Sequence, residues 1–212
     1  MSAREEILSR IGAALGQGVA VPEVPRAYEQ AGAGLPAGDE TVVARFCERV
    51  AEYRATVRRV GAGEVENAVA EACRELGARR LAVPAGNSRR PPGVELVVDD
   101  PPISAQSLDD FDGVLTGCAL AIAETGTIVL DGGAESGRRA LTLVPDLHIC
   151  VVEEARIHAS VPDAIAGVAA AAAEGRPLTF VSGPSATSDI ELERVEGVHG
   201  PRELVVLVVA PG

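Results

Sequence analysis

Short apolar runs alternate with helical patterns along most of this 212-residue chain, and this alternation constrains its fold more than any other feature. The apolar runs lie at residues 80–84, 94–98, 113–116, 127–130, 148–152, 178–181 and 204–209. Runs of this length are typical of strands that are buried on both faces. The pattern therefore predicts an α/β fold, in which helices cover a mostly parallel sheet on both sides.

Three helical patterns accompany these runs. The first spans residues 39–59, and its apolar face consists of Val42, Val43, Phe46, Val50, Tyr53 and Val57. The second spans residues 64–76 and ends at Gly77, and its expected inward face consists of Val65, Ala68, Val69, Ala72 and Leu76. The third runs through residues 164–174, begins near Ser160 and Asp163, and ends at Gly175. These helices are the expected cover of the sheet.

A separate helix is expected before the main body of the chain. Ser2 and Glu5 have the spacing of a capping box, and apolar side chains then repeat on one face at positions 7, 8, 11, 14 and 15. Residues 16–38 are rich in Gly, Pro and Ala without clear periodicity, which is typical of a linker. The sequence thus predicts an N-terminal helix and linker over residues 1–38 and an α/β domain over residues 39–212.

The composition excludes several classes of function. The chain carries 19 basic and 31 acidic residues, a net charge of −12 and no basic run, so nucleic acid and anionic membranes are not expected as partners. Lysine is absent, which excludes Schiff-base chemistry and a P-loop. The longest strongly apolar run, residues 204–210, is too short to span a bilayer, and the N-terminal helix is too charged for a secretory signal. We expect a cytoplasmic protein without membrane insertion.

The sequence contains no recognisable pattern of metal or cofactor ligands. Its 4 cysteines, at positions 47, 73, 118 and 150, never form a CxxC pair, and its 3 histidines lack the HxH and HExxH spacings. A GxGxxG dinucleotide fingerprint is absent as well. We therefore expect free thiols, no metal site and no bound cofactor.

The first candidate for chemistry is the segment that links two expected strands, from Gly117 to Thr127. Within it, Glu124 stands among small and apolar residues, a setting that suits a carboxylate to acid–base work or nucleophilic attack. Thr125, Gly126 and Thr127 follow it directly and are candidate ligand contacts. The structural alternative is that Glu124 caps or hydrogen-bonds the turn formed by these three residues.

The second candidate is the segment 182–189, directly after the expected strand 178–181. Small and hydroxyl-bearing residues that lead from a strand into a helix start form a natural cradle for an anion. Its candidate binding residues are Ser182, Gly183, Ser185, Thr187 and Asp189. An ordinary helix cap and turn is the alternative for the same residues.

His199 and Gly200 form the third candidate. A histidine in a glycine-containing loop is expected to be exposed, which favours a functional role over a core one. We expect Glu124, the segment 182–189 and His199 to converge on one crevice, because parallel strands deliver their following loops to one edge of the sheet. In that crevice, Glu124 and His199 are the candidate catalytic pair.

Three segments together resemble the LUD domain family of lactate-utilisation proteins. They are AIAETGTIVL, SGPSATSDIELERVEGVHGP and the terminal ELVVLVV. The opening REEILSRIGAAL, followed by VPRAY, is similar to the short, C-type members of the family. The ferredoxin-like cysteine motifs of the longer B-type members are absent, which also points to the short type.

The resemblance implies a three-layer α/β/α fold similar to the NagB, ribose-5-phosphate isomerase and CoA-transferase group. It also implies a cofactor-free subunit of an iron–sulfur system that oxidises L-lactate to pyruvate, with iron–sulfur and cysteine-rich partner proteins. Such a subunit would serve assembly, or bind an anionic substrate or nucleotide, without carrying electrons itself. Two alternatives remain open at this point: a stand-alone CoA-transferase-like or sugar-phosphate isomerase-like enzyme that uses Glu124, and a ligand-sensing protein without turnover.

Overall fold

Six parallel strands form the main sheet of the protein. The computed structural model describes residues 2–16, 23–28, 32, 34–188, 194–197 and 199–212. In spatial order, the strands of the main sheet are β1 (Thr56–Gly61), β12 (Glu203–Ala210), β7 (Leu147–Glu153), β4 (Gly113–Thr116), β2 (Arg80–Val83) and β3 (Glu95–Val98). All five neighbouring pairs are parallel, which confirms the predicted sheet.

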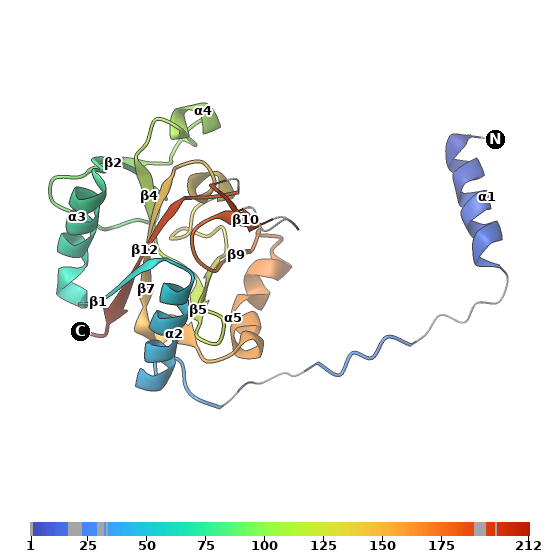
Figure 1. Cartoon of the computed structure of the whole chain (residues 1–212), viewed down its shortest axis with the longest axis horizontal. Coiled ribbons are helices and arrows are strands. Elements are labelled where there is room, and N and C mark those ends of the chain that lie inside the picture. Colours follow the sequence, from blue (N-terminus) through green and yellow to red (C-terminus); the bar gives the residue numbers. More distant parts are fainter. Residues whose placement is uncertain (1, 17–22, 29–31, 33, 189–193, 198) are drawn as a thin grey trace.

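Helices cover both faces of this sheet (Figure 1). Alternate side chains of β12 point to opposite sides: Val206 and Val208 enter one core with α2 (Glu40–Glu52), and Val205 and Leu207 enter the other with α3 (Val65–Leu76). A short helix, α4 (Ala105–Leu108), contributes Leu108 to a smaller core near β2 and β4. The arrangement of helix, sheet and helix confirms the expected α/β fold class.

A second, smaller sheet lies beside the first. Its order is β8 (Ile157–His158), β5 (Leu120–Ile122), β6 (Thr127–Leu130) and β9 (Thr179–Val181). One face shares the core of α2, and α5 (Val161–Ala173) packs on the other. The runs 127–130 and 178–181 were expected in the parallel sheet. This expectation is wrong, because β6 pairs antiparallel with both β5 and β9.

The helix predicted over residues 39–59 is shorter in the structure. α2 ends at Glu52, Arg54 takes a positive φ of 69°, and the chain then enters β1. Val50, Tyr53 and Val57 have helical spacing, but the β-branched residues after the turn pair with β12 instead. Tyr53 and Leu76, both expected to point inward, are exposed.

The N-terminal helix forms as predicted. In α1 (Ala3–Leu15), the Ser2 hydroxyl accepts from the Glu5 amide and the Glu5 carboxylate accepts from the Ser2 amide, which completes the capping box. No side chain of α1 is buried. Among the described residues, no helix is both long and apolar enough to cross a membrane.

The hairpin between β5 and β6 rests on α2 through a glycine. Gly126 has a φ of 61°, and a Cβ there would lie 2.8 Å from the carbonyl carbon of Arg49. Gly77 ends α3 with a similar φ of 72°, but nothing lies within 4 Å of its Cβ position. The two glycines therefore share a left-handed backbone and differ in the space around them.

We predict that Gly126→Ala lowers the free energy of unfolding by about 3 kcal/mol, because backbone strain and overpacking add. Gly77→Ala is the matched control and should cost about 1 kcal/mol, from backbone strain alone. Urea denaturation measures both values. Equal losses for the two variants would contradict the close packing of the hairpin on α2.

Candidate functional site

A pocket of about 240 Å³ brings together residues from four distant parts of the chain. It lies between the connection after β9, the 3₁₀ turn Arg139–Thr142, the start of β7 and the segment before β12. The polar side chains that line it belong to Arg139, Thr142, His148, Thr179, Ser182, Ser185 and His199. Several residues predicted from sequence thus share one cavity.

Antiparallel pairing of β9 with β6 places Ser182 at the wall of this pocket. Because Ile128 is paired with Val181, the residues just beyond the pairing, Thr127 and Ser182, lie side by side. Their hydroxyl oxygens are 2.7 Å apart, and the Thr125 hydroxyl lies 2.7 Å from that of Thr127. A row of three hydroxyl groups therefore runs from the β5–β6 hairpin to the pocket.

Residues 183–185 and 199–200 form the rest of this wall. The Ser185 hydroxyl accepts a hydrogen bond from the His199 amide at 3.1 Å. Gly183 has a φ of 98°, and a Cβ there would lie 2.6 Å from the Cβ of Tyr53, so this wall needs glycine to rest on the end of α2. Gly200 is buried and lies against Ser185. A Cβ at Gly200 would lie 3.5 Å from the Cβ of Ser185.

Arg139 supplies the positive charge of the pocket. Its Nη1 donates to the Thr142 hydroxyl at 3.1 Å and its Nη2 donates to the His199 carbonyl at 2.8 Å. Within the described part of the chain, no carboxylate forms an ion pair with it, and burial lowers the pKa of its guanidinium below the ordinary value. Sequence reasoning missed this residue because Arg139 stands in a short turn without a motif.

A buried polar group lies beneath the pocket. His148, the second residue of β7, is 1% exposed, and its Nε2 lies 2.8 Å from the Thr116 hydroxyl. That hydroxyl is also 3.8 Å from the Cys150 sulfur. A hydrogen bond with Cys118 and the nearby His148 lower the pKa of Cys150 below its ordinary value, although burial acts in the opposite direction. The floor of the pocket is therefore polar.

The Glu124 carboxylate points to another part of the small sheet. Glu124 is exposed, and its Oε2 accepts from the Val161 amide, the first residue of α5, at 3.3 Å. Its own amide donates to the Ala159 carbonyl, next to β8. Since β8 and β9 lie at opposite edges of this sheet, the structure groups His199 with Ser182 and Ser185, and places the Glu124 side chain at the start of α5.

The expected helix start does not form in the described part of the segment 182–189. Residues 186–188 form β10 (Ala186–Ser188), which pairs antiparallel with β11 (Arg194–Glu196), so Thr187 sits in a strand opposite Val195. Asp189 lies outside the described residues. Residues 182–188 therefore offer no helix amides to the pocket, whose polar groups here are hydroxyl groups and the Arg139 guanidinium.

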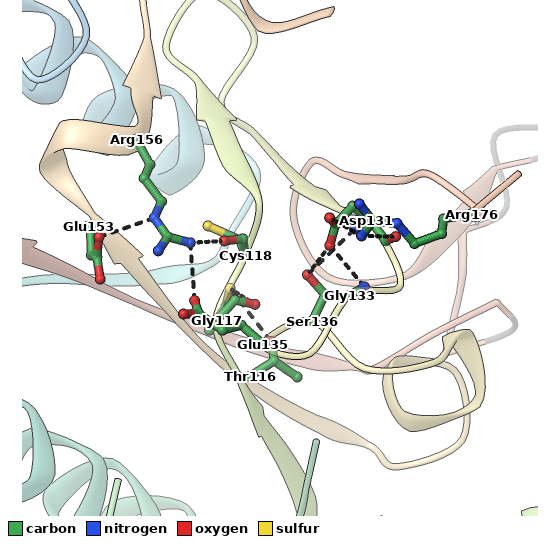
Figure 2. Close-up of polar contacts among 11 residues, drawn as sticks. Thr116, Gly117, Cys118, Asp131, Gly133, Glu135, Ser136, Glu153, Arg156 and Arg176 are labelled. Carbon is green, nitrogen blue, oxygen red and sulfur yellow. Dashed lines mark hydrogen bonds and ion pairs between the residues drawn. The ribbon is translucent and has the colours of Figure 1, made fainter. Parts of the chain in front are cut away.

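The pocket also lies at the opposite edge from the one expected. His148 is the second residue of β7 and residues 199–201 precede β12, so the pocket faces the amino ends of these strands. Figure 2 shows what occupies the carboxyl ends of β4 and β7: Arg156 donates to the Cys118 carbonyl at 2.8 Å and pairs with Glu135 and Glu153 at 3.1 Å. Ion pairs fill that part of the edge.

Three larger hollows contain none of the predicted residues. One, of about 370 Å³, lies at the carboxyl ends of β1, β7 and β12 beside Ser88 and Arg89, and includes the carboxylates of Glu66 and Glu153. A second, of about 750 Å³, follows the outer face of α3. The third, of about 330 Å³, lies at the end of α3 beside Arg74 and Arg79, and no hydroxyl-bearing side chain lines it. We place the candidate site in the smaller pocket, because its cationic and hydroxyl groups converge there without a carboxylate among them.

The comparisons with known proteins agree with this fold. Residues 104–209, which include every pocket residue, match the family model of the LUD domain. A Lactate utilization protein C from Deinococcus radiodurans is 52% identical over 177 residues, or 82% of each chain. A protein of the same name from Shouchella clausii is 28% identical over 188 residues, covering 82% of this chain and 81% of the other.

A solved structure agrees as well. The crystal structure of a DUF162 family protein from Deinococcus radiodurans aligns with a TM-score of 0.70 at 45% identity, covering 80% of this chain and 96% of that one. The chain therefore belongs to the LUD domain family, which confirms the resemblance seen in its sequence.

An ion pair holds the turn that presents Arg139. The neighbouring Arg138 donates to both carboxylate oxygens of Asp99, at 2.6 and 2.9 Å. Burial alone would raise the pKa of Asp99, but the hydrogen bonds from Arg138 and the Ile103 amide outweigh it and hold that pKa below the ordinary value of 3.8. The charged carboxylate therefore stabilises the fold at neutral pH.

We predict that Asp99→Asn lowers the free energy of unfolding at pH 7 by about 2 kcal/mol, the worth of hydrogen bonds to a charged group. Because the folded pKa is depressed, the contribution of Asp99 is present above pH 4 and is lost as pH falls through that folded value. The variant should thus lose less stability on acidification than the wild type does. Urea denaturation from pH 7 to pH 2 tests this, and parallel pH profiles would contradict it. Asp146→Asn, at an exposed pair with Arg202, is the control, with an expected change below about 0.5 kcal/mol.

Proposed function

We propose that this chain acts in lactate utilisation, as a cofactor-free subunit of a system that oxidises L-lactate to pyruvate and as the subunit that binds a small anionic ligand. Relatives named Lactate utilization protein C support a role in lactate utilisation. Arg139 supports the binding of an anion, because it is half-buried, faces hydroxyl groups and has no carboxylate partner among the described residues.

Electrostatics favours an anion in this pocket. A partly desolvated guanidinium gains more from a carboxylate or phosphate than a solvated one does, because fewer waters screen the pair. Arg139 donates through Nη1 and Nη2 to neutral oxygens, so its positive charge has no counter-ion among the residues that the structure describes. The pocket volume of about 240 Å³ suits a small acid.

The other polar groups would orient the ligand. Ser182 and Ser185 each carry a hydroxyl that both donates and accepts, which fits a carboxylate oxygen or the hydroxyl of a 2-hydroxy acid. The exposed His199 and the buried His148 add imidazole nitrogens at the mouth and the floor of the pocket. Together these residues bind and position a ligand, and His199 is the candidate to move a proton.

Removal of electrons from lactate requires a redox group. The sequence has no CxxC pair and no dinucleotide fingerprint, and the described residues include no group of three or more His, Cys, Asp or Glu side chains placed to hold a metal ion. We therefore assign electron transfer to iron–sulfur and cysteine-rich partner proteins of the same system.

We predict that Arg139→Gln weakens the binding of L-lactate or inorganic phosphate at least about tenfold, because it removes the charge that faces the anion. Arg139→Lys keeps the charge but loses the planar guanidinium, so its affinity for the anion should lie between those of the wild type and of Arg139→Gln. Isothermal titration calorimetry measures the affinities, and unchanged melting temperatures show that the fold is intact. Arg45→Gln, on the exposed face of α2, changes the net charge equally and should bind as the wild type does.

Glu124→Gln distinguishes this proposal from the alternative, a stand-alone CoA-transferase-like or sugar-phosphate isomerase-like enzyme that uses Glu124. The amide keeps an oxygen that can accept from Val161, so the proposal expects normal folding and unchanged anion binding. An enzyme that uses Glu124 as base or nucleophile would fold normally and fail to support growth on lactate. Full binding together with lost growth would therefore favour the alternative over a binding role alone.

The isolated chain should not oxidise lactate. We expect lactate-dependent electron transfer only when the chain is combined with the iron–sulfur and cysteine-rich proteins that co-purify with it from its native cell. An absorption spectrum with stoichiometric flavin or iron in the purified chain, or lactate oxidation by the chain alone, would overturn this part of the proposal.

A further inference from the structure

The N-terminal helix carries an apolar face that the rest of the chain leaves uncovered. Ile7, Leu8, Ile11 and Leu15 fall within about 100° of the helix circumference and are between 50% and 64% exposed. Figure 1 shows α1 apart from the body of the protein. An isolated helix of this length is only marginally stable in water, so α1 gains stability from any surface that covers this face.

A second uncovered apolar face lies on α5. Its inward side chains pack on the small sheet, while Val161 and Ile165 are 37% and 46% exposed on the outside. From residue 164 to residue 173, α5 has no charged or polar side chain, although surface helices ordinarily carry a polar outer face. Phe180 is 47% exposed on β9 and is paired with Val129, which packs beneath α5, so its ring extends the same face.

The linker is anchored beside this face of α5. The Gly32 amide donates to the Asp163 carboxylate at 3.0 Å, and the Gly38 amide donates to the Ile157 carbonyl at 3.1 Å. Sixteen residues lie between Leu15 and Gly32. Such a segment spans at most about 55 Å, whereas α5 is about 20 Å long. The segment between Leu15 and Gly32, called the arm below, therefore tethers α1 at the border of the α5 face. The arm can extend further than the length of this face.

We propose that a second copy of this chain covers both faces, with α1 of each copy packed on α5 of the other. Within one chain the apolar faces of α1 and α5 are both exposed. A two-fold symmetric pair of chains would bury the α1 face and the α5 face of each copy at once. The shapes are complementary, since large aliphatic side chains of α1 meet the alanine-rich surface of α5. Because each arm starts next to α5, it needs only to cross the symmetry axis to reach its partner helix.

The proposal expects a dimer of the full-length chain at micromolar concentration. Sedimentation equilibrium should show that Ile11→Glu on α1 and Ile165→Glu on α5 each raise the dimer dissociation constant at least tenfold. Ser9→Glu, on the opposite face of α1, is the matched control and should leave it unchanged. Unaltered melting temperatures would show that the body still folds. A monomeric wild type, or a dimer insensitive to Ile11→Glu, would overturn the proposal.

Cysteine cross-linking then distinguishes exchange between copies from contact within one chain. A mixture of an Ile11→Cys chain and an Ile165→Cys chain, oxidised with diamide, should give a disulfide-linked dimer made of one chain of each kind. A chain that carries both substitutions and cross-links only within itself would overturn the proposal, because α1 would then cover its own α5.

Discussion

The antiparallel pairing of β6 with β9 determines where the candidate pocket forms. It brings Ser182 beside Thr127 and turns the chain back over the start of β7. From there, residues 183–185 rest on the end of α2 and meet the segment 199–201 that precedes β12. Without this pairing, Ser182 would lose its neighbour Thr127 and its fixed position at the wall of the pocket.

The charge of the pocket depends on a second constraint. Asp99 follows β3 and binds Arg138, so the loop between β6 and β7 is fastened to the far side of the main sheet. This contact fixes the 3₁₀ turn and directs the next residue, Arg139, toward Thr142 and the His199 carbonyl. A part-buried ion pair of Arg138 thus supports the neighbouring Arg139, which has no carboxylate partner among the described residues.

The two constraints give the protein an unusual division of its sheet edges. In open parallel sheets, ligands ordinarily bind at the carboxyl ends of the strands. Here Arg156 joins the ends of β4 and β7 through the Cys118 carbonyl and Glu153, and it also pairs with Glu135. The amino ends of β7 and β12 instead face a pocket with hydroxyl groups and an arginine. The added sheet β8-β5-β6-β9 makes this possible, because it carries β9 past the amino ends of the main strands.

Most of the main sheet was predictable from sequence, because long apolar runs such as the one that forms β12 are decisive by themselves. The strands β1, β5, β8, β10 and β11 were missed: β1 continues the apparent period of α2, and each of the others has only 2 or 3 residues. Turn chemistry pointed to Ser182, Ser185 and His199, but their meeting with Arg139 depends on contacts across 60 residues. Short-range patterns carry no information about such contacts.

A crystal structure of the chain soaked with L-lactate tests the central claim most directly. The account predicts an ordered ligand whose carboxylate lies within hydrogen-bond distance of the Arg139 guanidinium and of the Ser182 or Ser185 hydroxyl. A ligand bound instead at the carboxyl ends of β1 and β12, beside Ser88 and Arg89, would contradict the assignment of the site to the Arg139 pocket.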